Sequence, residues 1–299
     1  MGNLDDIITK DNPAVATSKE KAPYDEKEWK QQKQIEREQA FTLIDDTAVA
    51  MTKDTKMFKD FLNVQSIFDR YSVGNILLIV AQKPNATNLA NFDKWKEQGV
   101  KIKNGEKSFV ILEPGDEYKR ADGSLGVGYN SKRVFDISQT NSTQKVDPIV
   151  RKDDRLLIKA LMNNTPVPII ISDKLDNTTG SVYIPENKEI LIRKGMVGPD
   201  IIRALSLEMA HAYMDKGNYN RSVSSFIALS ASYIICKRIG IDTNAHILKC
   251  LPPKYAGLDA QAMRNELAAI RNLANEISSS MSQVLNPPLK KQNKSEQSR

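Results

Sequence analysis

Residues 70–114 read RYSVGNILLIVAQKPNATNLANFDKWKEQGVKIKNGEKSFVILEP. Residues 75–82 carry a helical apolar pattern that ends before Pro84, because proline disfavours helix in the residue preceding it. Residues 101–112 instead alternate, turn at Asn104 and Gly105, and continue as an apolar run. An Asn-Gly pair between such flanks is typical of a β-hairpin. The segment therefore predicts a domain that is helical first and β-rich afterwards.

The neighbouring segments extend this pattern in both directions. Residues 25–39 are polar nearly all round, with Trp29 as the one large apolar residue, so they form either an exposed helix or a disordered segment. Residues 41–61 carry a helical pattern. Four glycines in residues 115–130 predict a long hairpin connection, and residues 134–137 predict a further short strand.

A polar stretch at residues 141–145, followed by Pro148, is expected to link two domains. Beyond it the patterns predict helices at 156–162, 199–216, 223–239 and 258–285, and strands at 167–171, 181–184 and 189–192. The turn at 185–188 makes the last two strands antiparallel.

The predicted fold class is α+β with two domains. Residues 41–143 are expected to form an α/β domain, and residues 144–285 a mainly helical domain with a small antiparallel sheet. Residues 1–40 are expected to be a polar tail or helix, and residues 286–299 a disordered basic tail.

Composition restricts the class of protein. Of the 299 residues, 40% are hydrophobic and 27% are charged, as is usual for globular proteins. No apolar run approaches the ~20 residues that span a bilayer, and the N-terminus lacks a secretory signal. Cys236 and Cys250 suit a reducing compartment and are expected to be small, buried apolar residues. We therefore expect a cytoplasmic protein with no membrane contact, whose net charge of +6 mildly favours polyanions.

Basic residues alternate with aromatic and amide residues between positions 70 and 107. Residues 82–107 hold six lysines against three acidic residues. Cationic side chains combined with aromatic faces are typical of single-stranded nucleic-acid sites. The pattern also fits a solvated surface with Phe92 and Trp95 in the core, and composition alone favours that interpretation. The candidate DNA-binding residues are Arg70, Tyr71, Asn75, Gln82, Lys83, Lys94, Trp95, Lys101, Lys103 and Lys107.

The predicted helix at 199–216 contains the sequence LEMAH at residues 207–211. A zinc peptidase helix reads H-E-x-x-H, in which two histidines one turn apart bind the metal and the glutamate is the general base. Here Leu207, which has no lone pair, stands in the place of the first histidine.

No nearby residue completes such a metal site in the sequence. Residues 223–236 contain no acidic residue, and His246 and the two cysteines are the remaining soft ligands. We therefore expect no metal and no other cofactor. Glu208 and His211 are expected to be remnants of a catalytic site.

Residues 70–114, together with VFDISQT at 134–140, resemble the N-terminal single-stranded-DNA-binding domain of ArdC-like antirestriction proteins. These proteins are found on conjugative plasmids, integrative elements and phages, so the resemblance implies a bacterial host. The family has a Tyr-Ser…Asn…Leu-Ile…Gln-x-Pro stretch, a Trp, a Lys-x-Gly-Glu-Lys turn and a Phe-Asp-x-x-Gln-Thr sequence. The matching positions are Tyr71, Ser72, Asn75, Leu78, Ile79, Gln82, Pro84, Ala86, Thr87, Trp95, Gly105, Glu106, Lys107, Phe135, Asp136, Gln139 and Thr140.

The second half is similar to the zincin-like metallopeptidase domain that follows in the same proteins, so the resemblance covers residues 41–285. Residues 208–212 match the end of the family's metal-binding helix. Leu207 replaces the first histidine, and Ser225, Ile227 and Leu229 fall where the family has a glutamate-rich stretch that supplies the third ligand. The loss of both kinds of ligand implies a pseudo-peptidase that no longer holds zinc.

Three functions remain open at this point. In the first, the protein binds single-stranded DNA of a mobile element or phage and protects or handles incoming DNA, in antirestriction or conjugation. In the second, it is a zinc metallopeptidase with an atypical metal site. In the third, the second domain docks a protein, such as a host nuclease or a conjugation protein. We favour the first, with a catalytically inactive second domain.

Overall fold

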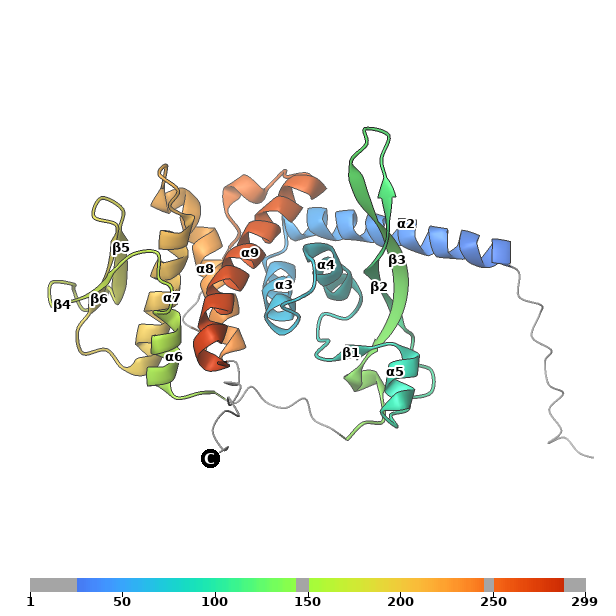
Figure 1. Cartoon of the computed structure of the whole chain (residues 1–299), viewed down its shortest axis with the longest axis horizontal. Helices are drawn as coiled ribbons and strands as arrows, with labels where there is room; N and C mark the ends of the chain where they lie inside the picture. Colours follow the sequence, from blue (N-terminus) through green and yellow to red (C-terminus); the bar gives the residue numbers. More distant parts are fainter. Residues whose placement is uncertain (1–25, 144–150, 245–249, 288–299) are drawn as a thin grey trace, which may run out of the picture.

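The computed structural model describes residues 26–143, 151–244 and 250–287 (Figure 1). The predictions for residues 1–25, for most of the linker, for His246 and for residues 288–299 lie outside this part. None of the helices within the described ranges has the length and apolar character needed to cross a membrane.

The first half begins with the helices α2 (Glu26–Met51), α3 (Thr55–Ile67) and α4 (Val73–Gln82). The polar segment that begins α2 is therefore helical. The single helical pattern predicted for residues 41–61 is wrong in one respect, because α2 ends and α3 begins within it. The cause is Asp54, whose carboxylate accepts a hydrogen bond from the backbone N–H of Met57 at 2.9 Å and so caps a new helix.

An antiparallel sheet with the strand order β1-β3-β2 follows these helices. Its strands are β1 (Leu89–Ala90), β2 (Phe109–Lys119) and β3 (Leu125–Asp136). The short helix α5 (Phe92–Glu97) comes before β2, and the 3-10 turn η1 (Ile137–Gln139) follows β3. Because the sheet is wholly antiparallel, this part is α+β, and the prediction of an α/β domain is corrected.

Strands β2 and β3 form a long hairpin that projects from the molecule (Figure 1). Most of the glycine-rich residues predicted as a connection therefore belong to β2 and β3, and the connection is confined to residues 120–124. At Gly126 a Cβ atom would lie 2.7 Å from the ring of Tyr118, so a larger residue there would displace that ring. The hairpin predicted around Asn104 and Gly105 is wrong: Gly105 turns with φ +83°, but Ile102 bridges to Thr140 rather than to β2.

The second half contains α6 (Asp154–Leu161), β4 (Ile169–Ser172), β5 (Ser181–Ile184), β6 (Glu189–Arg193), α7 (Gly198–Met214), α8 (Arg221–Arg238), η2 (Pro253–Tyr255) and α9 (Ala260–Leu285). These elements lie close to the predicted residues. Strands β5 and β6 are antiparallel, as predicted. The wholly antiparallel sheet is nevertheless wrong, because β4 lies on the far side of β6 and runs parallel to it.

One hydrophobic core joins the two halves. Helix α3 packs against α8, and α2 and α4 pack against α9, which crosses the middle of the molecule (Figure 1). The ring centroid of Phe58 lies 5.1 Å from that of Phe226 and 6.3 Å from that of Tyr255. The Tyr233 hydroxyl donates to Asn63 Oδ1 at 2.7 Å. The domain limits given above stay predictions, although the two sets of helices share a core.

Candidate nucleic-acid interface and the Glu208–His211 centre

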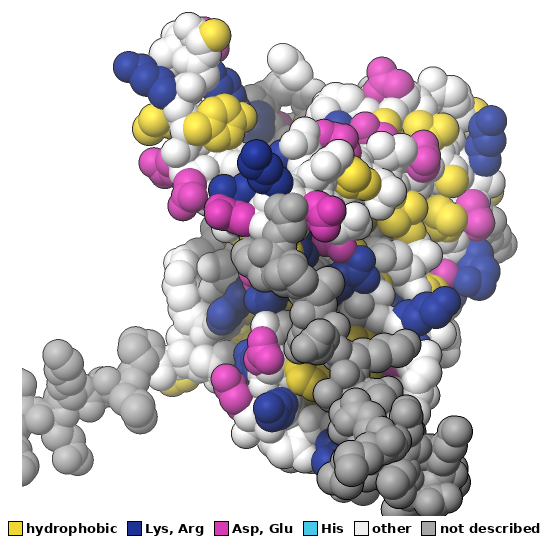
Figure 2. Space-filling model, turned by 90° about the vertical axis from the view of Figure 1, so that its right-hand side faces the viewer, with side chains coloured by type: hydrophobic (Ala, Val, Ile, Leu, Met, Phe, Trp, Pro, Cys, Tyr) yellow, Lys and Arg dark blue, Asp and Glu magenta, His cyan; other side chains and the backbone are white. Residues whose placement is uncertain are grey.

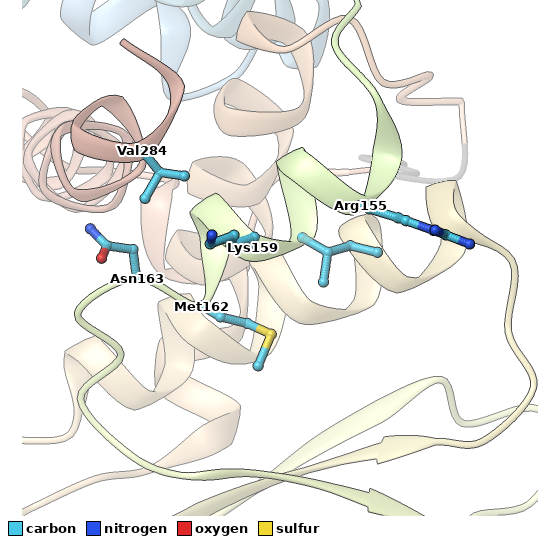
Figure 3. Close-up of a pocket in the computed structure, with 6 residues that line it drawn as sticks. Arg155, Lys159, Met162, Asn163 and Val284 are labelled. Atoms are coloured by element: carbon cyan, nitrogen blue, oxygen red, sulfur yellow. The ribbon is translucent and has the colours of Figure 1, made fainter. Parts of the chain in front are cut away.

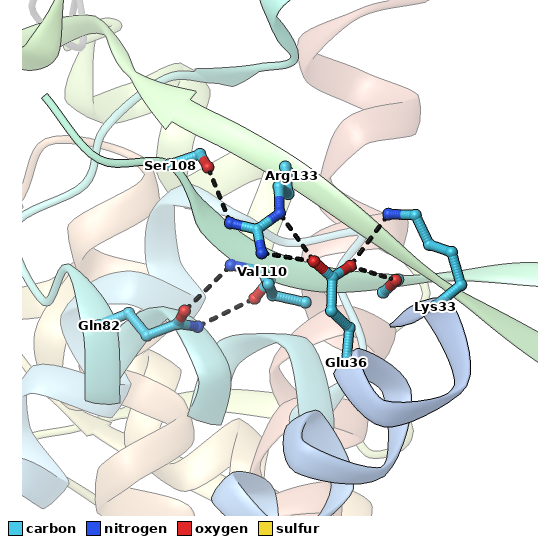
Figure 4. Close-up of polar contacts among 7 residues, drawn as sticks. Lys33, Glu36, Gln82, Ser108, Val110 and Arg133 are labelled. Carbon is cyan, nitrogen blue, oxygen red and sulfur yellow. Dashed lines mark hydrogen bonds and ion pairs between the residues drawn. The ribbon is translucent and has the colours of Figure 1, made fainter. Parts of the chain in front are cut away.

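Two side-chain amides on α4 take the place of a neighbouring strand beside β2. Asn75 Nδ2 donates to the carbonyl of Leu112 at 2.7 Å, and Asn75 Oδ1 accepts from the Leu112 N–H at 2.8 Å. Gln82 pairs in the same way with Val110, at 2.9 and 3.0 Å (Figure 4). Because β2 is an edge strand, these bonds satisfy backbone groups that would otherwise lack partners. Both amides, predicted as DNA contacts, are thus committed to the fold.

Trp95 belongs to the core rather than to the surface. Only 2% of it is exposed, and its ring N–H donates to the carbonyl of Phe135 at 3.1 Å. A nucleic-acid base therefore has no access to its ring in this structure. Phe92, which the alternative interpretation placed in the core, is exposed.

Three of the predicted lysines project from one short segment, residues 101–107, which we call the lysine loop. Lys101, Lys103 and Lys107 are all exposed there. Gln139 fixes the loop: its carbonyl accepts from the Lys103 N–H at 2.9 Å, and its side-chain amide donates to the carbonyl of Lys107 at 2.9 Å. The structure thus brings these three ammonium groups onto one element, while Lys94 is exposed on α5 and Lys83 is partly buried at the end of α4.

The buried carboxylate of Asp136 anchors the segment to which the lysine loop is attached. It accepts hydrogen bonds from the backbone N–H groups of Thr87, Asn88 and Ser138, at 2.6, 3.0 and 2.9 Å. Burial acts to raise the pKa of Asp136, but these hydrogen bonds outweigh it and lower the pKa. The Phe-Asp-x-x-Gln-Thr sequence is therefore a structural motif that positions the loop.

Arg70 and Tyr71 lie apart from the lysine loop, against α9. The Tyr71 ring stacks on Phe68 with a centroid separation of 5.4 Å, and burial raises its pKa. Arg271 of α9 donates from Nε to the carbonyl of Tyr71 at 2.8 Å. Arg70 is exposed and lines a hollow together with Arg271.

A groove of about 440 Å³ between α2 and β3 joins aromatic rings to cationic groups, and the sequence patterns did not predict it. We call it the aromatic groove. Trp29 on the helix is 49% exposed and Tyr129 on the strand is 41% exposed, so each wall offers a ring. No acidic residue lines it. Its lining residues are Trp29, Lys30, Lys33, Gln34, Arg37, Tyr129, Asn130 and Ser131.

The buried carboxylate of Glu36 joins the two walls of the aromatic groove (Figure 4). It accepts from Arg133 Nε at 2.9 Å, and from Ser131 Oγ and Lys33 Nζ, both at 3.0 Å. Burial acts to raise the pKa of Glu36, but these donors outweigh it and lower the pKa to about 2. Glu36 is therefore neutralised by its own partners, and Glu26 forms an ion pair with Lys30 at 2.6 Å.

The signal for the aromatic groove in the sequence was Trp29 itself, a lone large apolar residue on a polar segment. Its partner Tyr129 lies in the glycine-rich stretch that the patterns assigned to a connection. Figure 2 shows this side of the molecule, where basic side chains lie among acidic ones, and apolar side chains gather on the projecting hairpin. Electrostatic attraction alone would therefore be weak here, and the rings are the distinguishing feature.

Glu208 and His211 of α7 lie at the junction of α7, α8 and β5. The carboxylate of Glu208 is 2% exposed and accepts from the Tyr183 N–H at 2.6 Å. Arg221 approaches it with both terminal nitrogens, at 2.9 and 2.6 Å. A guanidinium group thus occupies the hydrogen-bonding positions of the carboxylate in a two-pronged ion pair.

His211 is buried next to this ion pair, and its Nδ1 lies 2.7 Å from the hydroxyl of Tyr219. Burial, and secondarily the charge of Arg221, lower the pKa of His211 to about 4. The imidazole is therefore neutral at physiological pH.

These residues do not fit a catalytic metal ion. Leu207 packs against the core and offers no ligand atom, Glu208 is saturated by Arg221 and Tyr183, and the guanidinium charge would repel a cation. Within the ranges that the structure describes, no three His, Cys, Asp or Glu side chains gather as potential metal ligands. Cys236 is buried as predicted, and burial raises its pKa to about 11; the predicted burial of Cys250 is wrong, because this residue is exposed.

A further hollow of about 490 Å³ lies between α6 and the end of α9 (Figure 3). Met162 and Val284 supply apolar lining, and Arg155 and Lys159 lie along its α6 side. It brings together no acid–base pair and no nucleophile, so it offers no site for chemistry.

The fold and these sites define a class: an α+β protein whose first half presents a groove lined by cationic and aromatic side chains, and whose second half buries the Glu208–Arg221 ion pair beside His211. Residues 30–147 match the family model of the N-terminal domain of the anti-restriction factor ArdC. This part of the chain is an ArdC-type N-terminal domain, and the resemblance predicted from its motifs is confirmed.

Other comparisons give more distant relatives. An uncharacterized protein of Bacillus anthracis is 25% identical over 269 residues, which cover 70% of this chain and 45% of that protein. The chain thus spans less than half the length of this curated relative. The metal-free crystal structure of the antirestriction protein ArdC from the R388 plasmid is 17% identical, with a TM-score of 0.44, over 72% of this chain and 84% of that one. Its Mn(II)-bound structure is 14% identical, with a TM-score of 0.47, over 71% and 85%.

Proposed function

We propose that this protein binds single-stranded DNA of a mobile element or phage and acts in antirestriction, as the name of the matching family indicates. The observation that carries the proposal is the aromatic groove, which begins one residue before the segment that matches the ArdC N-terminal domain. Two exposed rings and three cationic side chains line it without an acidic residue.

The groove offers both kinds of contact that unpaired DNA needs. An aromatic ring can stack on any base, which contributes about 1–3 kcal/mol per base, and this explains why such sites read little sequence. Lys30, Lys33 and Arg37 lie within reach of the phosphates that flank a base held between Trp29 and Tyr129. A duplex would bind more weakly, because its base faces are already stacked on one another.

The lysine loop extends this interface by electrostatic attraction. Its ammonium groups contact phosphate without selecting a base, so they contribute affinity that depends on salt. In this mechanism the lysine loop and the aromatic groove first attract the phosphates of single-stranded DNA, and its bases then stack on Trp29 and Tyr129.

We propose further that the second half has no peptidase activity. The two-pronged ion pair between Glu208 and Arg221 supports this, because a carboxylate bound in this way cannot act as a general base. The test is metal analysis of protein purified without chelators, together with a peptidase assay. We expect less than a tenth of an equivalent of zinc and no cleavage; one equivalent of zinc that is lost on His211→Ala would contradict the proposal.

Binding measured over a range of salt concentrations tests the DNA-binding function. Fluorescence anisotropy with a labelled oligo-dT should give a linear fall of log affinity with log salt, with a slope of about −0.7 for each phosphate contacted. Single strands should compete better than duplex DNA, because the base faces of a duplex are already stacked. Binding that is insensitive to salt, or absent at low salt, would contradict the proposal.

A triple variant separates the lysine loop from general charge. Lys101→Gln, Lys103→Gln and Lys107→Gln together should reduce the salt slope by about 2, since each phosphate contact contributes about 0.7. The matched control replaces Lys174, Lys194 and Lys216, three exposed lysines of the second half, and should leave the slope unchanged.

A further inference from the structure

A second polar hollow, of about 480 Å³, lies where the turn before α4 meets the end of α8 and one face of α9. It shares no lining residue with the aromatic groove. Its lining residues are Asp69, Arg70, Arg238, Arg271, Asn275, Ser278, Ser279 and Ser282.

Three guanidinium groups and one carboxylate line this hollow, which leaves an excess of positive charge. None of the three arginines forms an ion pair within the part of the chain that the structure describes. Asp69 attracts Arg238 electrostatically but does not reach ion-pair distance. The hollow thus concentrates cationic groups that lack a counter-ion.

Arg238 is the most deeply placed of the three. Its Nη1 donates to Ser278 Oγ at 3.1 Å and its Nη2 to the carbonyl of Gln65 at 3.2 Å, while its buried Nε has no partner. Burial lowers its pKa to about 10, with a further decrease caused by Arg271 that Asp69 opposes. A buried guanidinium without a carboxylate is costly, because it has lost water without gaining an opposite charge.

Arg271 is held in position by the fold, whereas Arg70 is exposed at the edge of the hollow. Arg271 Nε donates to the carbonyl of Tyr71 at 2.8 Å and its Nη1 to Asn272 Oδ1 at 3.2 Å. Asn275 is fixed through a 3.2 Å bond from its Nδ2 to the carbonyl of Asp69. Backbone and amide acceptors therefore aim these side chains without neutralising the guanidinium groups.

We infer that this hollow is a phosphate-binding site formed by Arg70, Arg238 and Arg271 with the serine hydroxyls of α9. A guanidinium group donates two parallel hydrogen bonds to a phosphate, and the hydroxyls of Ser278, Ser279 and Ser282 add donors on one wall. A phosphate would also neutralise the excess charge of the three guanidinium groups. The bound phosphate group would belong either to a free phosphate compound or to the backbone of a DNA strand.

Thermal unfolding of the full chain in the presence of inorganic phosphate tests the site, in buffer otherwise free of phosphate and sulfate. Because a ligand that binds only the folded state raises the unfolding temperature, phosphate should raise it with dose beyond a chloride control of equal ionic strength. Arg70→Gln and Arg271→Gln should each weaken the apparent affinity about tenfold, since each removes a charge-assisted contact. The matched control Arg155→Gln lies on α6, outside the hollow, and should respond like the natural protein.

Two results would overturn the inference: a phosphate response equal to that of chloride, or a response that survives in both site variants. Arg70 is exposed, so its variant should fold even if Arg271→Gln does not. Oligo-dT then identifies the source of the phosphate. Weaker oligonucleotide binding by Arg70→Gln would assign the site to the DNA backbone, and unchanged oligonucleotide binding with a lost phosphate response would assign it to a free phosphate compound.

This experiment is independent of the DNA-binding proposal. A phosphate response in a protein that binds no oligonucleotide would support the site and contradict the proposed function. Oligonucleotide binding without any phosphate response would support the proposed function and contradict the phosphate site.

Discussion

His211 shows how the surroundings of one residue change its chemistry. The sequence indicated a lost metal site, because Leu207 stands where a ligand would be, but it did not reveal what would replace the metal. In the structure a positive charge is supplied by Arg221, which binds Glu208 and lies close enough to lower the pKa of His211. Arg221 could not be selected from the sequence, because the contact joins two helices through a loop of unpredictable path.

The lowered pKa of His211 predicts a pH-dependent stability. The unfolded chain takes up a proton on this imidazole near pH 6.5 and the folded chain only near pH 4, so between these values the unfolded state holds more protons. The free energy of unfolding should therefore fall as the pH is lowered from 6.5 to 4, by at most about 3 kcal/mol. Denaturant unfolding across this range should show the fall, and His211→Gln should make it clearly smaller, with the remainder near pH 4 coming from carboxylates of lowered pKa such as Glu36. An equal pH dependence in the variant would contradict the assignment.

The two tryptophans show where residue patterns succeed and where they fail. Trp95 was considered both as a DNA contact and as a core residue, and composition alone favoured the core; the structure agrees, because Trp95 is 2% exposed and donates to the carbonyl of Phe135. Trp29 was noted only as an exception on a polar helix. The groove that Trp29 lines exists only together with Tyr129, which is distant in sequence and lies on the opposite wall.

At the scale of the elements, helix patterns predicted α4, α7, α8 and α9 well, because Pro84, Gly217 and Gly240 mark their ends. The predicted hairpin around Asn104 and Gly105 was wrong for a physical reason. Local turn chemistry identifies a turn at Gly105 but not the partner of the strand before it, which is Thr140 in the structure. Strand partners depend on distant contacts that periodicity does not contain.

The pairing of α4 with the edge of β2 leads to a second prediction. Asn75→Leu keeps the size of the side chain but leaves the N–H and C=O of Leu112 without partners. Because each buried unpaired group costs about 1–3 kcal/mol, the free energy of unfolding should fall by about 2–4 kcal/mol. Urea denaturation measures this, with Gln32→Leu on the exposed face of α2 as control. If the two variants proved equally stable, the amide pairing would be irrelevant to stability.

At the scale of the whole molecule, the shared core predicts that both halves unfold together. Phe58 of the first half packs against Phe226 and Tyr255 of the second. Calorimetry should show one transition whose calorimetric and van't Hoff enthalpies agree. Phe58→Ala should lower the stability by about 3–5 kcal/mol by creating a cavity between the halves. Two separate transitions, only one of them shifted by this variant, would show independent domains.

The central claim is that the aromatic groove holds unpaired DNA by stacking, and the emission of Trp29 tests it most directly. Because Trp95 is 2% exposed, a quenching ligand acts mainly on Trp29, which is 49% exposed. Titration with oligo-dT at low salt should quench the emission of the natural protein in step with binding. Trp29→Phe should still bind but show no quenching. Quenching that persists in this variant, or DNA binding by the natural protein without any change in emission, would contradict the claim.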